Sequence, residues 1–355
     1  MLKSKLLVIA LAFVLVVSAF AGTGQAGAAK GNVTVSLSTA TGAFGAGDAL
    51  VSVTFKNEGK TPAKILKWYT PYDDVEESLF VVTRDGSPVA YIGAIYKRAA
   101  PTAGDYVTLR SGESFTRSVD LRTYYDLSVS GQYSVQYHVS AWNLRSETAT
   151  LLKRDDTLSS NQLGMSLEGR ATDLSGRTIT LDVVTGSTSF TTCTTTQQSS
   201  LITARSQAST YAANASAYLN AGTQGSRYTT WFGVYNLTRY NTVKSNFAAI
   251  LSAMDTQSVT FNCKCKKSNT YAYVYANQPY TIYLCGAFWA APMTGTDSKG
   301  GTLIHEMSHF TVVAGTDDWA YGQTNAKALA ISNPTNAVDN ADSHEYFAEN
   351  TPAQP

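Results

Sequence analysis

The sequence predicts an α+β fold, in which an all-β, sandwich-like N-terminal region precedes a mainly helical domain with a small β-hairpin or sheet. Residues 30–185 contain short segments in which apolar and polar residues alternate, the period of a strand with one buried face. After residue 199 the chain becomes alanine-rich and its apolar residues recur at helical spacing. All four cysteines lie after residue 190. Together these shifts indicate two differently built halves.

The strands of the first half are short, and dipeptides such as Asp-Gly and Ser-Gly punctuate them. Such dipeptides form tight turns between antiparallel strands. Several short strands at this spacing favour a sandwich. The expected strand segments are residues 32–39, 49–59, 78–93, 113–121 and 131–142.

The second half combines helices with one hairpin. Helical spacing runs through 199–222 and through 228–254, where a break is expected near Gly233. Residues 270–289 read as a hairpin that turns at 277–279. The remaining helices are expected at residues 300–313, 319–332 and 336–350.

The N-terminus predicts export. Lys3 and Lys5 precede an apolar run at 6–20, and small residues follow at the spacing that a signal peptidase reads. A signal peptide is therefore expected over residues 1–21, with an alternative end near residue 28. The run is too short to span a bilayer comfortably. We expect a secreted, extracellular protein with no membrane partner after signal cleavage.

The composition excludes one class of partner. The chain has 355 residues, with 27 Lys and Arg against 26 Asp and Glu. A nucleic-acid partner would favour a basic face, so none is expected.

The four cysteines are Cys193, Cys263, Cys265 and Cys285. An even number in an exported chain indicates two disulfides. Cys263 and Cys265 flank one residue, so on a strand they share a face, are poorly placed to bond each other and are expected to reach elsewhere. The pair also lacks the two-residue spacer of a thiolate zinc site.

The motif His305-Glu306-x-x-His309 predicts a metal centre. On a helix, His305 and His309 lie one turn apart and face the same way, so both imidazoles can reach one ion. Glu306 lies beside them and can hold a water and take its proton. Leu303 and Ile304 contribute to the apolar face that packs this helix.

The third ligand separates the classes of zinc protease. A metzincin needs Gly three residues after the second His and another His three further on. Val312 and Gly315 occupy these positions, which excludes that class. Carboxylates remain: either aspartate of the pair 317–318, near the helix, or the distant Glu345. Spacing alone does not choose between the two aspartates, and either could instead cap a helix beginning near Trp319.

The stretch HEMSHF…GTDDWAYG resembles the aspzincin zinc metalloendopeptidases, the deuterolysin family, and is more similar to their peptidyl-Lys metalloendopeptidase branch. The resemblance covers about residues 189–355. It includes RYTTWFG, YLCGAFW, GTDS and NADSHEYFAEN, at residues 227–233, 283–289, 295–298 and 340–350.

The resemblance implies a fold and roles for individual residues. The helical half would be a zincin-type catalytic domain with one Zn²⁺ per chain, held by His305, His309 and Asp318. Glu306 would be the base and Tyr321 an oxyanion donor. The implied disulfides are Cys193–Cys263 and Cys265–Cys285, in which the CKC pair splits.

The resemblance also implies specificity. In the Lys-specific branch, late acidic residues receive the lysine that follows the scissile bond, and the matching positions are Asp342 and Glu345. Three residues apart, they share a helix face. Without the resemblance, a solvated acidic face would be the favoured interpretation. His344, between them, is not expected to bind zinc.

The order of the halves suggests a zymogen. We expect a β-sandwich pro-region over 22–185 and a zinc metalloendopeptidase domain over 186–355, with candidate cleavage sites at Lys153-Arg154 and Arg170. The partners of the catalytic domain would be protein or peptide substrates and its own pro-region, which would act as an intramolecular inhibitor. The protein is expected to be a monomer. The alternatives are a permanent accessory domain, a broad-specificity deuterolysin-like protease, or a secreted binding or toxin module with a structural metal.

Overall fold

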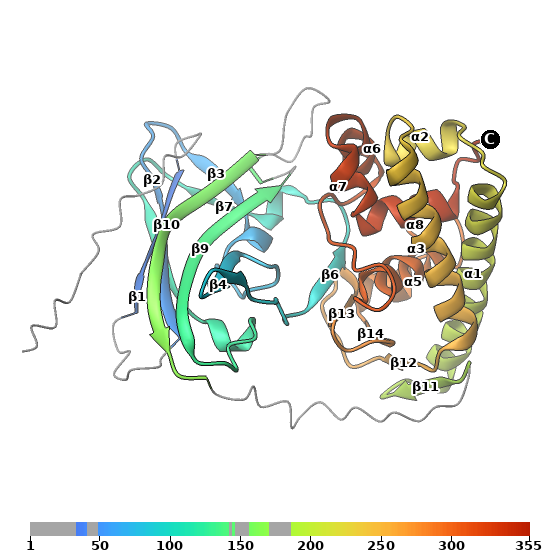
Figure 1. The fold of residues 1–355 in the computed structure, drawn as a ribbon, viewed down its shortest axis with the longest axis horizontal. Coiled ribbons are helices and arrows are strands. Elements are labelled where there is room, and N and C mark those ends of the chain that lie inside the picture. Colours follow the sequence, from blue (N-terminus) through green and yellow to red (C-terminus); the bar gives the residue numbers. More distant parts are fainter. Residues whose placement is uncertain (1–32, 41–48, 142–143, 146–155, 170–185) are drawn as a thin grey trace, which may run out of the picture.

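The chain is a mixed α+β protein in the computed structural model, which describes residues 33–40, 49–141, 144–145, 156–169 and 186–355 (Figure 1). The expected α+β class is confirmed. The expected signal peptide and the candidate cleavage residues at 153–154 and 170 lie outside the described residues. No helix in the described ranges is long and apolar enough to cross a membrane.

The first half is built of sheets around one core. A three-stranded sheet has the order β1-β2-β8, a four-stranded sheet the order β10-β9-β4-β5, and β3 pairs with β7. Apolar side chains of these sheets form a single buried cluster. The strands are β1 (Val33–Thr39), β2 (Leu50–Asn57), β3 (Ala63–Leu66), β4 (Phe80–Arg84), β5 (Ser87–Pro88), β7 (Tyr106–Leu109), β8 (Ser114–Asp120), β9 (Gly131–Ala141) and β10 (Asp156–Leu167), with 3-10 turns at Lys67–Tyr69, Ala103–Asp105 and Leu121–Thr123.

All five expected strand segments form strands. The segment 78–93 is a hairpin, because Asp85 and Gly86 both have positive φ, at 48° and 82°, which suits a tight turn between antiparallel strands. Asn161 of β10 joins the two larger sheets: its side chain accepts from the Leu37 amide at 2.9 Å and donates to the Leu37 carbonyl at 3.0 Å.

The second half is mainly helical. Thr194 caps the first helix and Asn236 the third. The expected break falls at Gly233, whose φ of 77° ends α2. The elements are β11 (Thr188–Thr191), α1 (Thr195–Asn220), α2 (Ser226–Phe232), α3 (Leu237–Thr256), β12 (Val259–Asn262), β13 (Thr270–Val274), β14 (Thr281–Leu284), α4 (Gly286–Ala290), α5 (Lys299–His309), α6 (Gln323–Ser332), α7 (Pro334–Val338) and α8 (Ala341–Glu349).

Three expected helix boundaries were wrong. The helix expected from residue 300 to 313 ends at His309, and the one expected from 319 begins at Gln323. The helix expected over 336–350 is two helices, α7 and α8. The two disulfides are Cys193–Cys263 and Cys265–Cys285, as the resemblance implied.

One strand of the first half belongs to the sheet of the second. β6 (Ile95–Arg98) pairs antiparallel with β13 and completes the order β11-β12-β14-β13-β6. In this register Tyr96 lies opposite Tyr273, and Lys97 lies opposite Ala272. β6 therefore reaches from one half to the edge of the other's sheet (Figure 1).

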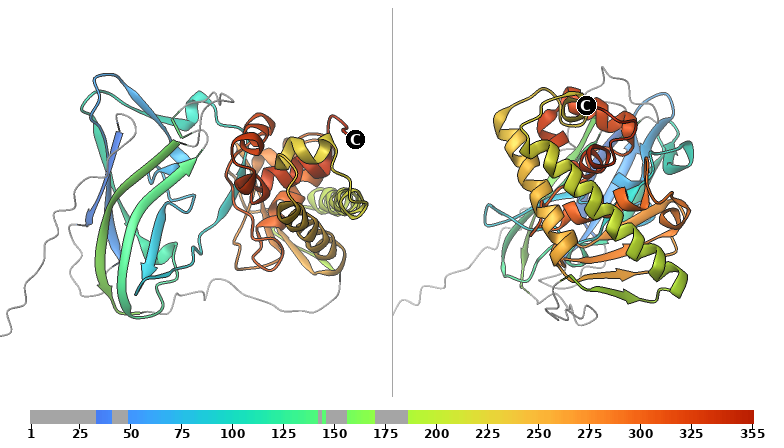
Figure 2. Two further views of the ribbon diagram at one scale, coloured as in Figure 1. Left: turned by 45° about the horizontal axis from the view of Figure 1, so that its top comes forward. Right: turned by 90° about the vertical axis from the view of Figure 1, so that its right-hand side faces the viewer.

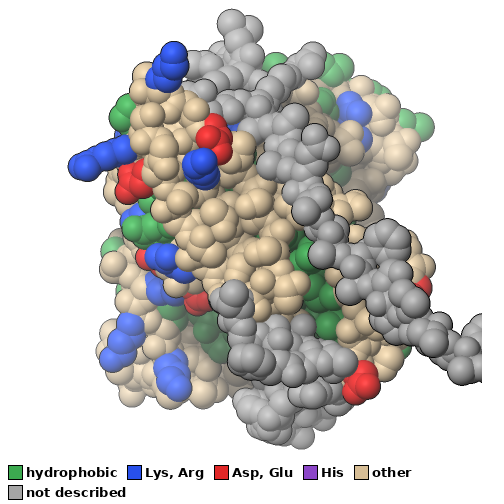
Figure 3. Space-filling model, turned by 90° about the vertical axis from the view of Figure 1, so that its left-hand side faces the viewer, with side chains coloured by type: hydrophobic (Ala, Val, Ile, Leu, Met, Phe, Trp, Pro, Cys, Tyr) green, Lys and Arg blue, Asp and Glu red, His purple; other side chains and the backbone are tan. Residues whose placement is uncertain are grey.

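Helix α5 runs through the centre of the second half, and every one of its residues is buried. The long helices α1 and α3 pack side by side, away from the first half (Figure 2). On the opposite end of the molecule, lysines and arginines are interspersed with acidic side chains among the described residues (Figure 3). This face presents no continuous basic stripe in its described part.

Candidate metal centre

Helix α5 presents the two histidines to one point. Its N-terminus is fixed by Ser298, whose hydroxyl accepts from the Gly301 amide at 2.9 Å, the usual role of serine at an N-cap. His305 and His309 are fully buried, and their ring centroids lie 4.8 Å apart. The helical spacing therefore brings the imidazoles together as the sequence predicts.

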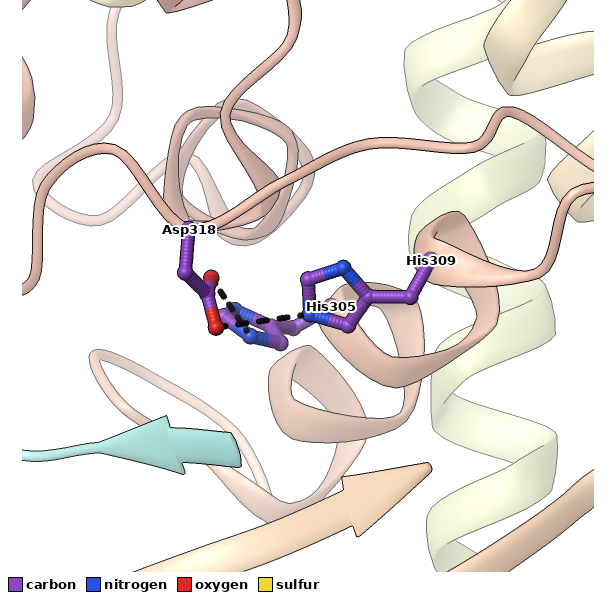
Figure 4. Close-up of side chains that lie close together, drawn as sticks. All are labelled: His305, His309 and Asp318. Atoms are coloured by element: carbon purple, nitrogen blue, oxygen red, sulfur yellow. Dashed lines mark ion pairs between the residues drawn. The ribbon is translucent and has the colours of Figure 1, made fainter. Parts of the chain in front are cut away.

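Asp318 returns to these histidines after a tight turn. Gly315, at φ 62°, lets the chain reverse after α5. The Thr316 carbonyl lies 2.8 Å from His309 Nδ1 and orients that ring. Asp318 Oδ1 lies 3.3 Å from His305 Nε2, and Oδ2 lies 3.6 Å from His309 Nε2. The three side chains point toward one another (Figure 4).

The geometry separates the two aspartates. Asp318 is buried, whereas Asp317 is exposed and its carboxylate accepts the Asp318 amide at 2.8 Å. Neither aspartate caps α6, because that helix begins after Gly322. The turn thus directs Asp318, and not Asp317, at the histidines.

These three residues fit a zinc ion. His305 Nε2, His309 Nε2 and Asp318 Oδ1 are buried and have no hydrogen-bond partner among the described residues. One ligand atom from each lies within 4.8 Å of the others. Two imidazoles and a carboxylate are a common donor set for catalytic zinc, and buried polar atoms left without partners are costly unless something binds them.

Glu306 follows His305 on α5 and is buried within the same part of the domain. It is fully buried, and neither carboxylate oxygen has a hydrogen-bond partner within the described chain. Burial raises the pKa of Glu306 to about 8. A carboxyl with a pKa near neutrality suits proton transfer in both directions.

The Tyr321 hydroxyl joins the centre to the first half. It lies 3.0 Å from each of three acceptors: Asp318 Oδ2, the Tyr96 carbonyl and Glu77 Oε1. A hydroxyl carries one proton and donates to one of them at a time. Arg98 in turn donates to the Tyr321 hydroxyl at 3.2 Å.

Asp342 and Glu345 of α8 form an acidic pocket beside the metal centre, and Lys97 of β6 fills it. The Lys97 ammonium, fully buried, lies 3.3 Å from Asp342 Oδ1 and 2.5 Å from Glu345 Oε2. Asp297 Oδ1 lies 3.8 Å away, and the ring centroid of Tyr271 5.0 Å away.

Lys97 and Asp342 stabilise each other's charge in this pocket, whereas burial raises the pKa of Glu345. Burial alone would lower the pKa of Lys97, but the carboxylates of Asp342, Glu345 and Asp297 raise it well above its ordinary value. Burial would raise the pKa of Asp342, but Lys97 and His305 hold it well below its ordinary range. The pocket is thus built to hold one buried cation.

Asp342 also touches the metal centre. Its Oδ1 lies 2.8 Å from His305 Nδ1, the ring nitrogen that faces away from Asp318, and its Oδ2 accepts the Gly322 amide at 2.6 Å. A carboxylate at the second nitrogen of a metal-ligating histidine commonly fixes ring orientation. Glu345, the distant candidate for third ligand, lies on the Nδ1 side of His305, at 3.5 Å.

His344 has a structural role. Its Nδ1 lies 3.0 Å from the Asn340 carbonyl and its Nε2 lies 3.1 Å from Asn246. The ring packs against Phe232 and Phe247. Both ring nitrogens therefore have partners other than His305, His309 and Asp318.

Sequence reasoning missed the contributions of the first half. Arg98 forms ion pairs with Glu76 and Glu77, and the Glu77 carboxylate contacts Tyr321. In the sequence these are scattered charges in short irregular segments. The buried Lys97 sits in the four-residue strand IYKR, whose pattern gives no local signal of its partners.

Comparisons with known proteins agree with this geometry. Residues 217–349 match the family model described as lysine-specific metallo-endopeptidase, the aspzincins. An extracellular protease of Aeromonas hydrophila is 44% identical over 312 residues, which cover 86% of this chain and 89% of that protein. A peptidyl-Lys metalloendopeptidase of Pleurotus ostreatus is 58% identical over 165 residues, 46% of this chain and 98% of that protein.

Two further matches are also named as peptidases. A peptidyl-Lys metalloendopeptidase of Armillaria mellea is 38% identical over 322 residues, 86% of this chain and 88% of that protein. Among solved structures, a zinc peptidase from Grifola frondosa matches 46% of this chain and 100% of its own, with 51% identity and a TM-score of 0.45.

Proposed function

Since this chain belongs to the aspzincin family of lysine-specific metallo-endopeptidases and is a zinc metalloendopeptidase, we propose that it is secreted as a zymogen and cleaves peptide bonds on the N-terminal side of lysine. The convergence of His305, His309 and Asp318 beside the buried Glu306 carries the catalytic part of this proposal. The acidic pocket next to them carries the specificity.

His305, His309 and Asp318 would hold one zinc ion per chain, and Asp342 would orient His305 from behind. When bound, zinc polarises the scissile carbonyl and lowers the pKa of a water molecule. The unpartnered ring nitrogens and the unpartnered Asp318 oxygen support this ligand set over one that uses Asp317. Glu345 is the weaker candidate because it pairs with Lys97 and lies on the Nδ1 side of His305.

Glu306 and Tyr321 would carry the remaining chemistry. Glu306 takes a proton from the attacking water and later returns it to the leaving amine, which its pKa near 8 allows. Tyr321 donates its hydroxyl hydrogen to the developing oxyanion. Its contact with a peptide carbonyl, that of Tyr96 at 3.0 Å, supports this role.

Asp342 and Glu345 would receive the lysine that follows the scissile bond. The support comes from the chain itself, because Lys97 fills this pocket with its ammonium against both carboxylates. Relatives named peptidyl-Lys metalloendopeptidases, at 58% and 38% identity, support the same preference.

We further propose that residues 22–185 are a pro-region that inhibits the domain 186–355. Lys97 fills the lysine pocket, and β6 covers the edge of the sheet. A relative whose nearly full length corresponds to 46% of this chain supports a catalytic half that works without the rest. The named extracellular protease of Aeromonas supports secretion, and the enzyme would act as a monomer.

The test is a digest. The processed protein is incubated with an unstructured substrate such as casein, and the new N-termini are sequenced. Termini beginning predominantly with lysine are expected, and Glu306→Gln should abolish them while retaining zinc. A broad set of termini would refute the lysine preference, and zinc binding without chelator-sensitive proteolysis would favour a structural metal.

A further inference from the structure

The strand β6 enters the centre in the manner of a bound peptide. It adds an antiparallel strand to the edge of a sheet through β13, and edge addition is a common way to bind an extended peptide through its backbone. Alternate side chains then enter pockets. Lys97 enters the acidic pocket, while Tyr96 before it packs against Tyr273 on the neighbouring strand. Figure 4 shows β6, in teal, beside the three converging side chains.

The peptide bond between Tyr96 and Lys97 has a contact with the proposed active centre on each side. The Tyr96 carbonyl accepts from the Tyr321 hydroxyl at 3.0 Å. The next side chain, Lys97, lies 3.3 Å from Asp342 and 2.5 Å from Glu345. A substrate cut before lysine must present its scissile carbonyl to the oxyanion donor and the following lysine to the acidic residues. The Tyr96–Lys97 bond satisfies both conditions at once.

We propose that Tyr96–Lys97 is a processing site that the chain cuts in itself. This inference rests on the proposed function and assigns that active centre an internal substrate. One water molecule supplies both the oxygen that is added to the carbonyl carbon and the proton that is added to the leaving nitrogen. Its oxygen bonds to the Tyr96 carbonyl carbon, the bond from that carbon to the Lys97 nitrogen breaks, and Glu306 carries the water proton to that nitrogen. The products are a Tyr96 carboxylate and a free Lys97 amino group.

The cut leaves the two pieces of the first half associated. β4 lies before the cut and β9 after it, yet they pair along residues 80–84. β2 and β8 pair across the cut in the same way. Glu77 also lies before it, and its ion pair with Arg98 becomes a contact between two pieces. The cut therefore breaks the chain within β6 while the two pieces of the first half stay paired with each other, before the first half dissociates.

The experiment uses the full chain. Unprocessed chain is supplied with zinc at two chain concentrations tenfold apart, and products are followed by intact mass and N-terminal sequencing. The expected product begins Lys97-Arg98-Ala99-Ala100, and its first-order rate constant is the same at both concentrations because the reaction is intramolecular. Glu306→Gln should give none. Lys97→Met should lose this product, whereas Lys60→Met, at an exposed turn, should keep it.

The casein digest separates the possible failures. A chain that cuts casein before lysine but never yields the Lys97 terminus overturns this inference and leaves the proposed function intact. A rate constant that rises with chain concentration also overturns it, because the cut would then be made by another molecule. Processed protein that does not cut casein refutes the proposed function, and this inference with it.

Discussion

Replacing Lys97 by methionine should open the lysine pocket to external peptides. Methionine keeps most of the side-chain volume but leaves Asp342 and Glu345, both fully buried, without their cation. Removing one partner of a buried ion pair costs about 3–5 kcal/mol, which corresponds to about 100- to 4,000-fold in an equilibrium constant. Water can hydrate the carboxylates once β6 loosens, so we expect the lower end, about 100-fold.

The assay measures competition for the pocket. A fluorescent peptide with one lysine is titrated into the intact chain carrying Glu306→Gln, which prevents cutting, with and without Lys97→Met. Anisotropy should report a Kd lower by about 100-fold in the double variant, by the same reasoning. Lys60→Met, at an exposed position, should leave the Kd unchanged. Equal Kd values for the Lys97 variant and its parent would refute the claim that Lys97 occupies the substrate pocket.

The remaining predictions concern the metal centre and its support. Because the histidines face Asp318, the Asp318→Ala variant should lose bound zinc, whereas Asp317→Ala should retain it. Elemental analysis measures the zinc content, and the reverse result would exchange the roles of the two aspartates. Asp342→Asn should raise KM for lysine substrates and also weaken zinc binding about 10- to 100-fold, because it contacts a ligand from behind; unchanged zinc affinity would contradict this. Glu349→Ala should lower the free energy of unfolding by about 1–3 kcal/mol, because its carboxylate accepts the Ser298 amide and hydroxyl at 2.8 and 2.7 Å; an unchanged urea midpoint would contradict this.

Local sequence patterns predicted most of the fold and the helix α5 that bears the two histidines. Alternation marked the strands of the first half, and the i, i+4 spacing of His305 and His309 marked a shared helix face. Gly233 broke a helix because its positive φ suits a helix end. These signals lie within a few residues of the structure they determine.

Boundaries failed where distant contacts override local preference. The helix expected from residue 319 starts four residues later because the Asn340 side chain accepts the amides of Trp319 and Ala320 and holds them in a turn. The choice of Asp318 over Asp317 likewise depends on that turn, and not on spacing.

The insertion of β6 had no local signal at all. Lys97 and Asp342 are 245 residues apart in sequence, and a four-residue strand offers too few positions for a period to be read. A lysine followed by an arginine also resembles an ordinary solvated surface pair. Only the assembled structure shows that both of these cations are buried.

The double contact of Asp342 constrains how new specificities can arise on this scaffold. One of its oxygens lies near both the Lys97 ammonium and His305, so a substitution here that changed the proposed lysine preference would also disturb the proposed zinc ligands. Glu345 has an oxygen with no hydrogen-bond partner among the described residues and approaches His305 less closely, at 3.5 Å. Laboratory evolution toward substrates other than lysine should therefore accumulate changes at Glu345 and leave Asp342 in place.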